Sequence, residues 1–328
     1  MIISRTPVRI ALGGGGTDLP AYYSKHGAAL ISAAIDKYVY ILVKPRFNQE
    51  IRVSYSQTEI VSSVEDIQHP VVRETLRFLK IDGGIEIVSV ADVPANAGLG
   101  TSSSFTVGLL NALYAYKGEY PTAKVLAQEA YTIERVILAE AGGLQDQYVA
   151  AFGGLITIDV NTAGEVSVRP LAINRDLLAE LESRLLFFDT RLTRMASEIQ
   201  AEHVKALAGG VGEAIQSLHT IKRIGVETRE ALERADLDQF GRLLNEHWLH
   251  KRRVARNISN GDIDRWYELA RQAGALGGKL IGAGGGGFLM FCCDQEHRDR
   301  VRRVLAGEQL GEVRFRFEPT GSRILVNL

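Results

Sequence analysis

Several features that mark other protein classes are scarce in this 328-residue chain. Its two cysteines, Cys292 and Cys293, are neighbours, so a disulfide between them would be strained, and neither has a second ligand at metal-site spacing. No apolar stretch reaches the roughly 18 residues that span a bilayer, and no signal-peptide profile follows Met1. The 38 Lys and Arg are balanced by 39 Asp and Glu, which argues against a nucleic-acid partner. These absences predict a cytoplasmic protein that binds neither nucleic acid nor membranes.

Glycine, by contrast, is abundant and clustered. The chain has 33 glycines, and they gather in segments 13–16, 98–100 and 282–287. Such clusters indicate places where the backbone approaches a ligand closely. With 46% hydrophobic residues the chain can bury a large core, and its length predicts about two domains.

The periodicity of apolar residues predicts an α+β chain whose two domains meet near residue 180. The first part, 1–180, combines alternating strand patterns with helical ones, and the second, 181–328, reads as a small sheet backed by helices. Strands are expected at 38–43, 51–55, 85–90, 155–160, 185–189, 279–281, 288–292, 312–318 and 324–326. Helices are expected at 19–26, 70–79, 102–116, 122–141, 195–235, 237–256, 262–274 and 295–305.

The glycine-rich loop 94–104 joins a strand to the helix expected from Ser102, with Ser and Thr residues as its caps. The first amides of a helix are unpaired donors and its dipole is positive there, so the loop is suited to a phosphate. It is no Walker A motif, because the one Gly-Lys pair, Gly278-Lys279, is followed by Leu280. The alternative is a serine-capped helix after a tight turn.

Segment 282–287 formally satisfies the G-x-G-x-x-G pattern of dinucleotide-binding folds. That pattern must open a helix, whereas the apolar run 288–292 predicts a buried strand, so a hairpin is expected and an NAD-dependent dehydrogenase is disfavoured. A flexible turn without a ligand is the alternative. In the third cluster, Asp18 either caps the helix near Leu19 or accepts hydrogen bonds from sugar hydroxyls.

Two carboxylates, Glu134 and Asp146, have ordinary interpretations as a solvated helix surface and a helix cap. From the pattern alone those structural roles are favoured. Phosphoryl transfer, however, needs a carboxylate or hydroxyl for Mg²⁺ and a group that orients or deprotonates the attacking hydroxyl. Both parts are present in this chain.

Three motifs in order, segments 7–12, 98–103 and 279–287, make the chain similar to the GHMP kinases, the superfamily of galacto-, homoserine, mevalonate and phosphomevalonate kinases. Further segments resemble the D-glycero-D-manno-heptose 7-phosphate kinase branch: 5–9, 13–18, 143–148 with 151–154, and 244–248 with Lys251-Arg252. The resemblance covers essentially the whole chain. It implies an N-terminal mixed-sheet nucleotide-binding domain over 1–180 and a C-terminal ferredoxin-like α/β sandwich over 181–328.

The resemblance also implies roles for individual residues and the cofactors ATP and Mg²⁺. Asp146 matches the catalytic carboxylate and Arg9 the basic residue beside it, while Ser102 and Glu134 match the metal ligands. The residues matching the phosphate loop are Pro94, Ala97, Gly98, Leu99, Gly100, Thr101, Ser102, Ser103 and Ser104. The substrate side comprises Asp18 with Gly14, Gly15, Gly16 and Thr17, and the loop Gly284, Gly285 and Gly286.

Two positions depart from the family pattern. Val8 stands where glycine is usual, which is expected to alter only strand packing, and Arg191 replaces the glycine of a Thr-Gly-x-x-Arg segment. If the acceptor carries a phosphate, cations must face it, and Arg191, Arg194, Lys251 and Arg252 are the candidates. A solvated helix surface is the alternative for each.

The expected reaction is phosphorylation of the anomeric hydroxyl of a sugar, D-glycero-D-manno-heptose 7-phosphate to the 1,7-bisphosphate, for nucleotide-activated heptose synthesis. Alternatives are another sugar 1-kinase of the fucokinase or galactokinase type and a catalytically silent regulator that binds nucleotide and sugar. The presence of Asp146, Glu134 and Ser102 together argues against a regulator, which needs no base. The partner is a small-molecule sugar or sugar phosphate, and a monomer or homodimer is expected.

Overall fold

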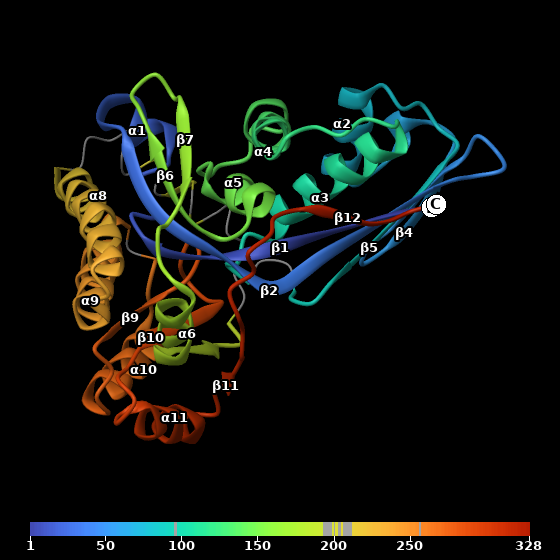
Figure 1. Cartoon of the computed structure of the whole chain (residues 1–328). Coiled ribbons are helices and arrows are strands. Elements are labelled where there is room, and N and C mark those ends of the chain that lie inside the picture. Colours follow the sequence, from blue (N-terminus) through green and yellow to red (C-terminus); the bar gives the residue numbers. More distant parts are fainter. Residues whose placement is uncertain (95–96, 193–198, 200, 203–204, 206–211, 256) are drawn as a thin grey trace.

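The structure, a computed structural model, describes the chain except residues 95–96, 193–198, 200, 203–204, 206–211 and 256. Arg194 therefore lies outside the described residues. The remainder forms two sheets with helices around them (Figure 1). Within these ranges, none of the helices combines the length and apolar character needed to cross a membrane.

The larger sheet has eight strands in a mixed arrangement. Six follow the order β12-β1-β2-β5-β3-β4, while β6 pairs with both β2 and β7. Pairing between β3 and β5 is parallel, and the other pairs are antiparallel. The strands are β1 (Ile2–Gly13), β2 (Ala28–Pro45), β3 (Ile51–Ser54), β4 (Thr58–Val61), β5 (Ile85–Ala91), β6 (Leu155–Val160), β7 (Val166–Pro170) and β12 (Arg323–Asn327).

Helices cover both faces of the central strands. Figure 1 shows α2 to α5 on one side of the sheet and the α8–α9 pair with the second sheet on the other. Because both faces are covered, β1 is buried continuously over 6–13 instead of alternating. The helices of this part are α1 (Pro20–His26), a 3₁₀ turn (Val64–Asp66), α2 (Pro70–Leu79), α3 (Thr101–Tyr116), α4 (Ala123–Tyr131), a π-helical turn (Thr132–Ile137), α5 (Gln145–Phe152) and α6 (Arg175–Arg184).

The second sheet is antiparallel, with the order β11-β8-β10-β9. Numbered from β8 onward, this order is 4-1-3-2, with helices between the first and second and between the third and fourth strands. That is the ferredoxin-like arrangement expected for the C-terminal part. Its elements are β8 (Leu185–Asp189), α8 (Gly212–Glu233), α9 (Leu237–Val254), α10 (Gly261–Gln272), β9 (Gly277–Leu280), β10 (Phe288–Cys292), α11 (Arg298–Gly307) and β11 (Gly311–Glu312).

Three elements differ from the sequence-based expectation. The helix expected over 122–141 ends as α-helix at Tyr131 and continues as a π-helical turn. The strand expected over 312–318 is only β11, because the chain then crosses between the sheets: Val313 still bonds to Phe187, but Phe317 bridges to Ile35 of β2. β12 pairs with β1, so the last strand belongs to the first sheet. The boundary near 180 separates the sheets except for this strand, and the domain limits stay a prediction.

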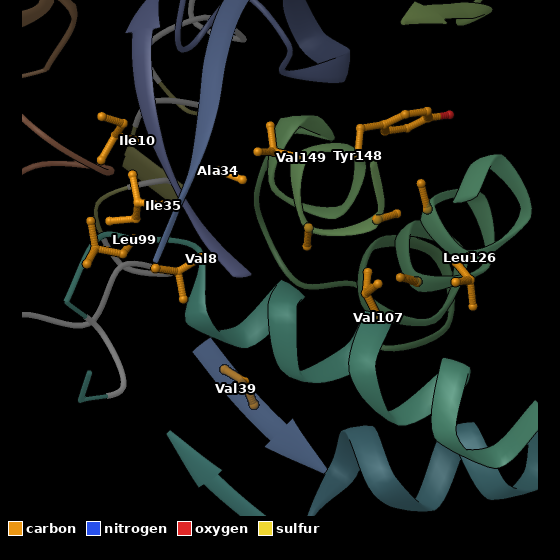
Figure 2. Packing of buried hydrophobic residues seen from close by; sticks show 14 of the residues in the cluster. Val8, Ile10, Ala34, Ile35, Val39, Leu99, Val107, Leu126, Tyr148 and Val149 are labelled. Atoms are coloured by element: carbon orange, nitrogen blue, oxygen red, sulfur yellow. The ribbon is translucent and has the colours of Figure 1, made fainter. Parts of the chain in front are cut away.

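The core extends directly beneath the glycine loop that precedes α3. Leu99 is 1% exposed and packs in the same cluster as Val8 and Ile35, at the crossing of β1 and β2 (Figure 2). Val8 is fully buried and faces Ile35 across the β1–β2 pair, so the residue that replaces the usual glycine acts in strand packing. Burying a side chain of the size of Leu99 contributes about 1.5–3 kcal/mol, and this burial holds the loop on the sheet.

Candidate active site

A cavity lies between the large sheet and the second part of the chain. It is lined from one side by β1 and the segment before α5, and from the other by α8, α9, β9 and the glycine loop after β9. Its charged and titratable residues are Arg9, Asp18, Asp146, His247, Lys251 and Lys279. The others are Ala11, Gly15, Gly16, Leu19, Gly143, Gln145, Leu218, Ile221, Val254, Gly282 and Ala283.

Arg9 and Asp146 form a two-point ion pair in this cavity. Arg9 Nε donates to Asp146 Oδ1 at 2.7 Å and Nη2 donates to Oδ2 at 2.8 Å. Arg9 sits in the buried run of β1 and is 6% exposed, so this pairing offsets the cost of burying its charge. Its Nη1 donates to the Gly98 carbonyl at 2.6 Å, which ties the pair to the loop before α3. The Asp146 side chain is 18% exposed and thus accessible from the cavity.

The start of α3 differs from the expected serine cap. Its N-cap is Gly100, with φ +74°, and no side chain caps the helix. The hydroxyls of Ser103 and Ser104 are engaged elsewhere, with Glu134 and with the Pro7 carbonyl at 2.8 Å each. The first amides of α3 therefore have no side-chain acceptor from a cap, and an anion can accept from them. Ser102 is exposed at this helix start.

The two glycine loops pack backbone against backbone. A Cβ on Gly98 would lie 2.7 Å from the Ile281 carbonyl oxygen, and one on Gly282 would lie 2.5 Å from the Gly98 Cα. Gly98 also has a φ of +79° and Gly282 one of +86°. Side chains at these positions would push the loops apart. Glycines thus allow the loop before α3 to pack on the β9–β10 hairpin, and the pairing of β9 with β10 confirms the expected hairpin over 282–287.

Asp18 lies beside the ion pair but is held by backbone amides. It is 2% exposed, and it accepts from the amides of Gly16 at 3.2 Å and Gln145 at 3.1 Å. It does not cap α1, whose N-cap Leu19 has no side-chain cap. Burial raises the pKa of Asp18, the charge of Asp146 adds to that rise, and the amide hydrogen bonds oppose it. Gly143 allows the approach, since a Cβ there would lie 1.9 Å from Asp18 Oδ2.

Glu134 is fully buried, which corrects its interpretation as a solvated helix surface. It lies in the π-helical turn and accepts from Ser103 at 2.8 Å, Thr106 at 2.5 Å and Gln147 at 2.5 Å. Arg135 Nη2 lies 3.3 Å from Glu134 Oε2. Burial raises the pKa of Glu134, and Arg135 with the three hydrogen bonds counteracts the rise.

The pair expected to hold Mg²⁺, Ser102 and Glu134, is not joined in this arrangement. Hydroxyl and carboxylate oxygens suit the ion, but both oxygens of Glu134 are engaged, and Ser103 is the serine that reaches them. Among the described residues, no three His, Cys, Asp or Glu side chains are grouped as metal ligands. Glu134 Oε1 accepts one of these hydrogen bonds, from Thr106, and keeps a second lone-pair direction, so a Mg²⁺ ion held by Ser102 and Glu134 stays a prediction.

Comparison with known proteins identifies the family. The profiles of the "GHMP kinases N terminal domain" and "GHMP kinases C terminal" match residues 67–154 and 228–310. A D-glycero-alpha-D-manno-heptose 7-phosphate kinase from Campylobacter jejuni is 33% identical, over 94% of each chain. The chain belongs to the GHMP kinase family. It is thus an enzyme, a phosphotransferase with an alcohol group as acceptor, and more narrowly a GHMP sugar kinase.

Other GHMP kinases match along the whole chain. The crystal structure of a D-glycero-D-manno-heptose 1-phosphate kinase from Bacteroides thetaiotaomicron superposes with a TM-score of 0.82 at 27% identity, covering 99% of each chain. An L-fucokinase/L-fucose-1-P guanylyltransferase from Bacteroides fragilis is 27% identical over 97% of this chain and 37% of its own. A Lactococcus lactis galactokinase complexed with galactose shares the fold, with a TM-score of 0.76 at 19% identity, covering 100% of this chain and 95% of its own. The expected two-domain α+β fold is confirmed.

This GHMP kinase brings together only some of the residues predicted for its site. Arg9, Asp146, Asp18, Gly15 and Gly16 line the cavity, as does Lys251. The remaining predicted substrate residues within the described ranges do not line it: Gly14, Thr17, Arg191, Arg252, Gly284, Gly285 and Gly286. The loop before α3 does not line the cavity but contacts it through Arg9, which donates to the Gly98 carbonyl.

The residues outside the cavity have structural contacts instead. Thr17 is fully buried and donates to the Gly14 carbonyl at 2.8 Å. Arg252 pairs with Asp264 at 2.7 Å. Arg191 is exposed and has a φ of +55°, a conformation natural for the glycine it replaces. Their predicted contacts with a substrate stay predictions.

Three polar cavity residues were not among the predicted site residues: His247, Lys279 and Gln145. His247 lies four residues before Lys251, so both point from one face of α9, and that spacing was a usable signal. Lys279 directly precedes the third glycine motif on β9. No spacing or local pattern indicated a cavity position for Gln145, because its contacts are with Asp18, which is far away in the sequence.

Proposed function

We propose that this GHMP sugar kinase transfers the γ-phosphoryl group of ATP to the anomeric hydroxyl of D-glycero-D-manno-heptose 7-phosphate. The observation that carries the proposal is the Arg9–Asp146 pair, exposed to the cavity at the point where the loop before α3 ends. A Cβ on Gly100 would lie 3.2 Å from Asp146 Oδ2, so the carboxylate lies against the helix start. The names of the Campylobacter and Bacteroides relatives support a heptose phosphate acceptor.

Different residues of the site bind the nucleotide, accept the proton and offset the negative charge during phosphoryl transfer. The unpaired amides at the start of α3 bind the phosphates of the nucleotide, and ATP supplies the phosphoryl group when bound. Asp146 accepts a hydrogen bond from the attacking sugar hydroxyl and takes its proton. Each Asp146 oxygen accepts one Arg9 N–H and keeps a second lone-pair direction for this purpose. Arg9 also offsets negative charge that develops during transfer.

Asp18 and the adjacent glycines form the second wall of the acceptor site. Asp18 is held by two backbone amides, so its carboxyl group has a fixed orientation toward the cavity. A carboxyl group fixed in this way binds a sugar hydroxyl and orients the ring. A Mg²⁺ ion at Ser102 and Glu134 stays a prediction, as do a cytoplasmic location and a monomeric or homodimeric state.

The test is an ADP-release assay with a panel of acceptors. D-glycero-D-manno-heptose 7-phosphate, its 1-phosphate, unphosphorylated heptose, L-fucose and D-galactose are compared by kcat/KM, and ³¹P NMR identifies the phosphorylated position. We expect the 7-phosphate to be the best acceptor and the product to carry phosphate at C1. Preference for fucose or galactose would support the alternative sugar 1-kinase, and ADP release with none of the sugars would support the silent regulator.

A further inference from the structure

Three basic side chains line one side of the cavity, and phosphoryl transfer as described above does not use them. His247 and Lys251 lie one turn apart on α9, and Lys279 faces them from β9. Their exposed fractions are 0%, 8% and 2%. Basic groups are rarely buried this deeply unless they are paired.

No carboxylate within the described part of the chain pairs with either lysine at 4.0 Å or less. The two carboxylates of the cavity are engaged elsewhere, Asp146 with Arg9 and Asp18 with backbone amides. With both lysines protonated, Arg9, Lys251 and Lys279 bring more positive charge to the cavity than Asp18 and Asp146 neutralise. Such an excess is suited to an anionic ligand.

Several hydrogen-bond donors of these side chains are unused. Lys251 Nζ donates to the carbonyls of Leu280 at 3.0 Å and Gly282 at 2.5 Å, which leaves one of its three N–H groups. Lys279 Nζ lies 3.2 Å from His247 Nδ1, which leaves two more. These free donors belong to groups that line the same cavity.

His247 supplies a further donor. Burial and the neighbouring lysine ammoniums lower its pKa well below the usual value, so the ring is neutral. When the Lys279 ammonium donates to Nδ1, the proton of the neutral ring is on Nε2. Nε2 is buried and forms no hydrogen bond of normal geometry, although a polar contact with the Gly15 backbone raises the pKa of the ring. An unpaired buried donor in a cavity indicates a missing acceptor.

The charged forms of both lysines are disfavoured in the cavity as it stands. Burial, with Arg9 adding to it, lowers the pKa of Lys251 to about 7. Burial followed by the charges of Lys251 and Arg9 lowers the pKa of Lys279 well below its usual value. An anion among them would favour the charged forms.

The three basic side chains share their cavity with Arg9 and Asp146, and not with the loop proposed to bind the nucleotide. No residue of the segment 97–104 lines this cavity, whereas Leu218, Ile221 and Asp18 do. Arg252 is bonded to Asp264 and Arg191 is exposed, so among the cations expected to face an acceptor phosphate only Lys251 reaches the cavity within the described residues.

We propose that Lys251, Lys279 and the Nε2–H of His247 bind the phosphate group that the acceptor sugar already carries. This inference rests on the proposed function and assigns to it the residues that distinguish a sugar phosphate from a free sugar. The free sugar leaves these buried donors unpaired, and a site with unpaired donors discriminates against it.

The test compares two acceptors in four proteins. Wild type, Lys279→Met, Lys251→Met and the control Arg242→Met are assayed with D-glycero-D-manno-heptose 7-phosphate and with unphosphorylated heptose. Arg242 is exposed on the same helix α9 and hydrogen-bonds only to Gln239. We expect each lysine variant to raise KM for the 7-phosphate about 10- to 100-fold, because the phosphate loses one charged hydrogen-bond partner. KM for heptose and for ATP should stay within about twofold, and Arg242→Met should behave as wild type.

Three outcomes would overturn the proposal. Equal losses with both acceptors, or a changed KM for ATP, would place the lysines at the transferred phosphoryl group or in the scaffold. An unchanged preference for the 7-phosphate would remove them from recognition. If melting temperatures show that the lysine variants do not fold, inorganic phosphate is tested as an inhibitor of wild type. Competition with the 7-phosphate but not with heptose supports the anion site. Competition with ATP alone contradicts it.

Failure of the proposed function gives a different result. In that case wild type does not phosphorylate the 7-phosphate. The anion site is then judged by the rise in melting temperature that inorganic phosphate produces in wild type. Loss of this rise in Lys279→Met with retention in Arg242→Met supports the anion site whichever sugar is the acceptor, and an equal rise in all proteins contradicts it.

Discussion

The contact between the two glycine loops makes a prediction about Gly98. In Gly98→Ala, the new Cβ would lie 2.7 Å from the Ile281 carbonyl oxygen, closer than ordinary contacts allow. The backbone there also has a φ of +79°, which an alanine adopts only with strain. The loop before α3 must therefore move away from the β9–β10 hairpin.

The two costs can be separated with a matched variant. Gly118, just after α3, has a similar φ of +77° but nothing within 4 Å of a new Cβ. Gly118→Ala thus measures backbone strain alone, about 1–2 kcal/mol. Gly98→Ala adds the steric term, typically 1–3 kcal/mol for overpacking, so we expect a total of about 2–5 kcal/mol.

The assay combines urea unfolding with the kinetics of ADP release. Displacing the loop that is proposed to bind the nucleotide phosphates by a fraction of an ångström should lower kcat/KM for ATP about 10²-fold in Gly98→Ala. Gly118→Ala, remote from the cavity, should keep kcat/KM within about twofold. If both variants lose the same stability and Gly98→Ala keeps its kcat/KM, the loops are not held by this contact.

Further predictions concern individual side chains of the site. Asp146→Asn should lower kcat by about 10² or more with KM for ATP nearly unchanged, and near wild-type turnover would exclude it as the base. Because the pKa of Lys251 is about 7 in the folded protein and higher when unfolded, the unfolded state binds more protons between these values. The free energy of unfolding of wild type relative to Lys251→Met should therefore rise with pH above 7, by at most about 1.4 kcal/mol per pH unit, and a flat difference in urea titrations would contradict this. Arg191→Gly should stabilise the protein by about 1 kcal/mol, because it relieves a φ of +55°, and should leave KM for the acceptor unchanged; a raised KM would place Arg191 at the substrate.

Local patterns were sufficient where local physics decides the structure. The alternating and helical spacings of apolar residues predicted most strands and helices. The apolar run 288–292 predicted the strand of the hairpin that argues against a dinucleotide-binding fold. The prediction that serines cap α3 was wrong. Gly100 is the N-cap in a left-handed conformation, and the Ser103 and Ser104 hydroxyls bond to partners distant in the sequence. Glu134 was misread for the same reason: its partners lie 13 to 31 residues away in the sequence. Residues whose role depends on such contacts require the tertiary structure.

The two carboxylates of the cavity illustrate how the fold assigns different chemistry to similar residues. Asp146 faces a guanidinium that neutralises it, whereas Asp18 faces only neutral amides, and burial and Asp146 both raise its pKa. Asp146 is held by two hydrogen bonds from Arg9 and keeps lone pairs that face the cavity, as the proposed acceptor of the proton requires. A carboxyl group with a raised pKa is better suited to exchanging hydrogen bonds with a neutral sugar hydroxyl. The different roles proposed for the two carboxylates thus follow from Arg9, which β1 brings to Asp146 and not to Asp18, and the acidic residues alone do not determine them.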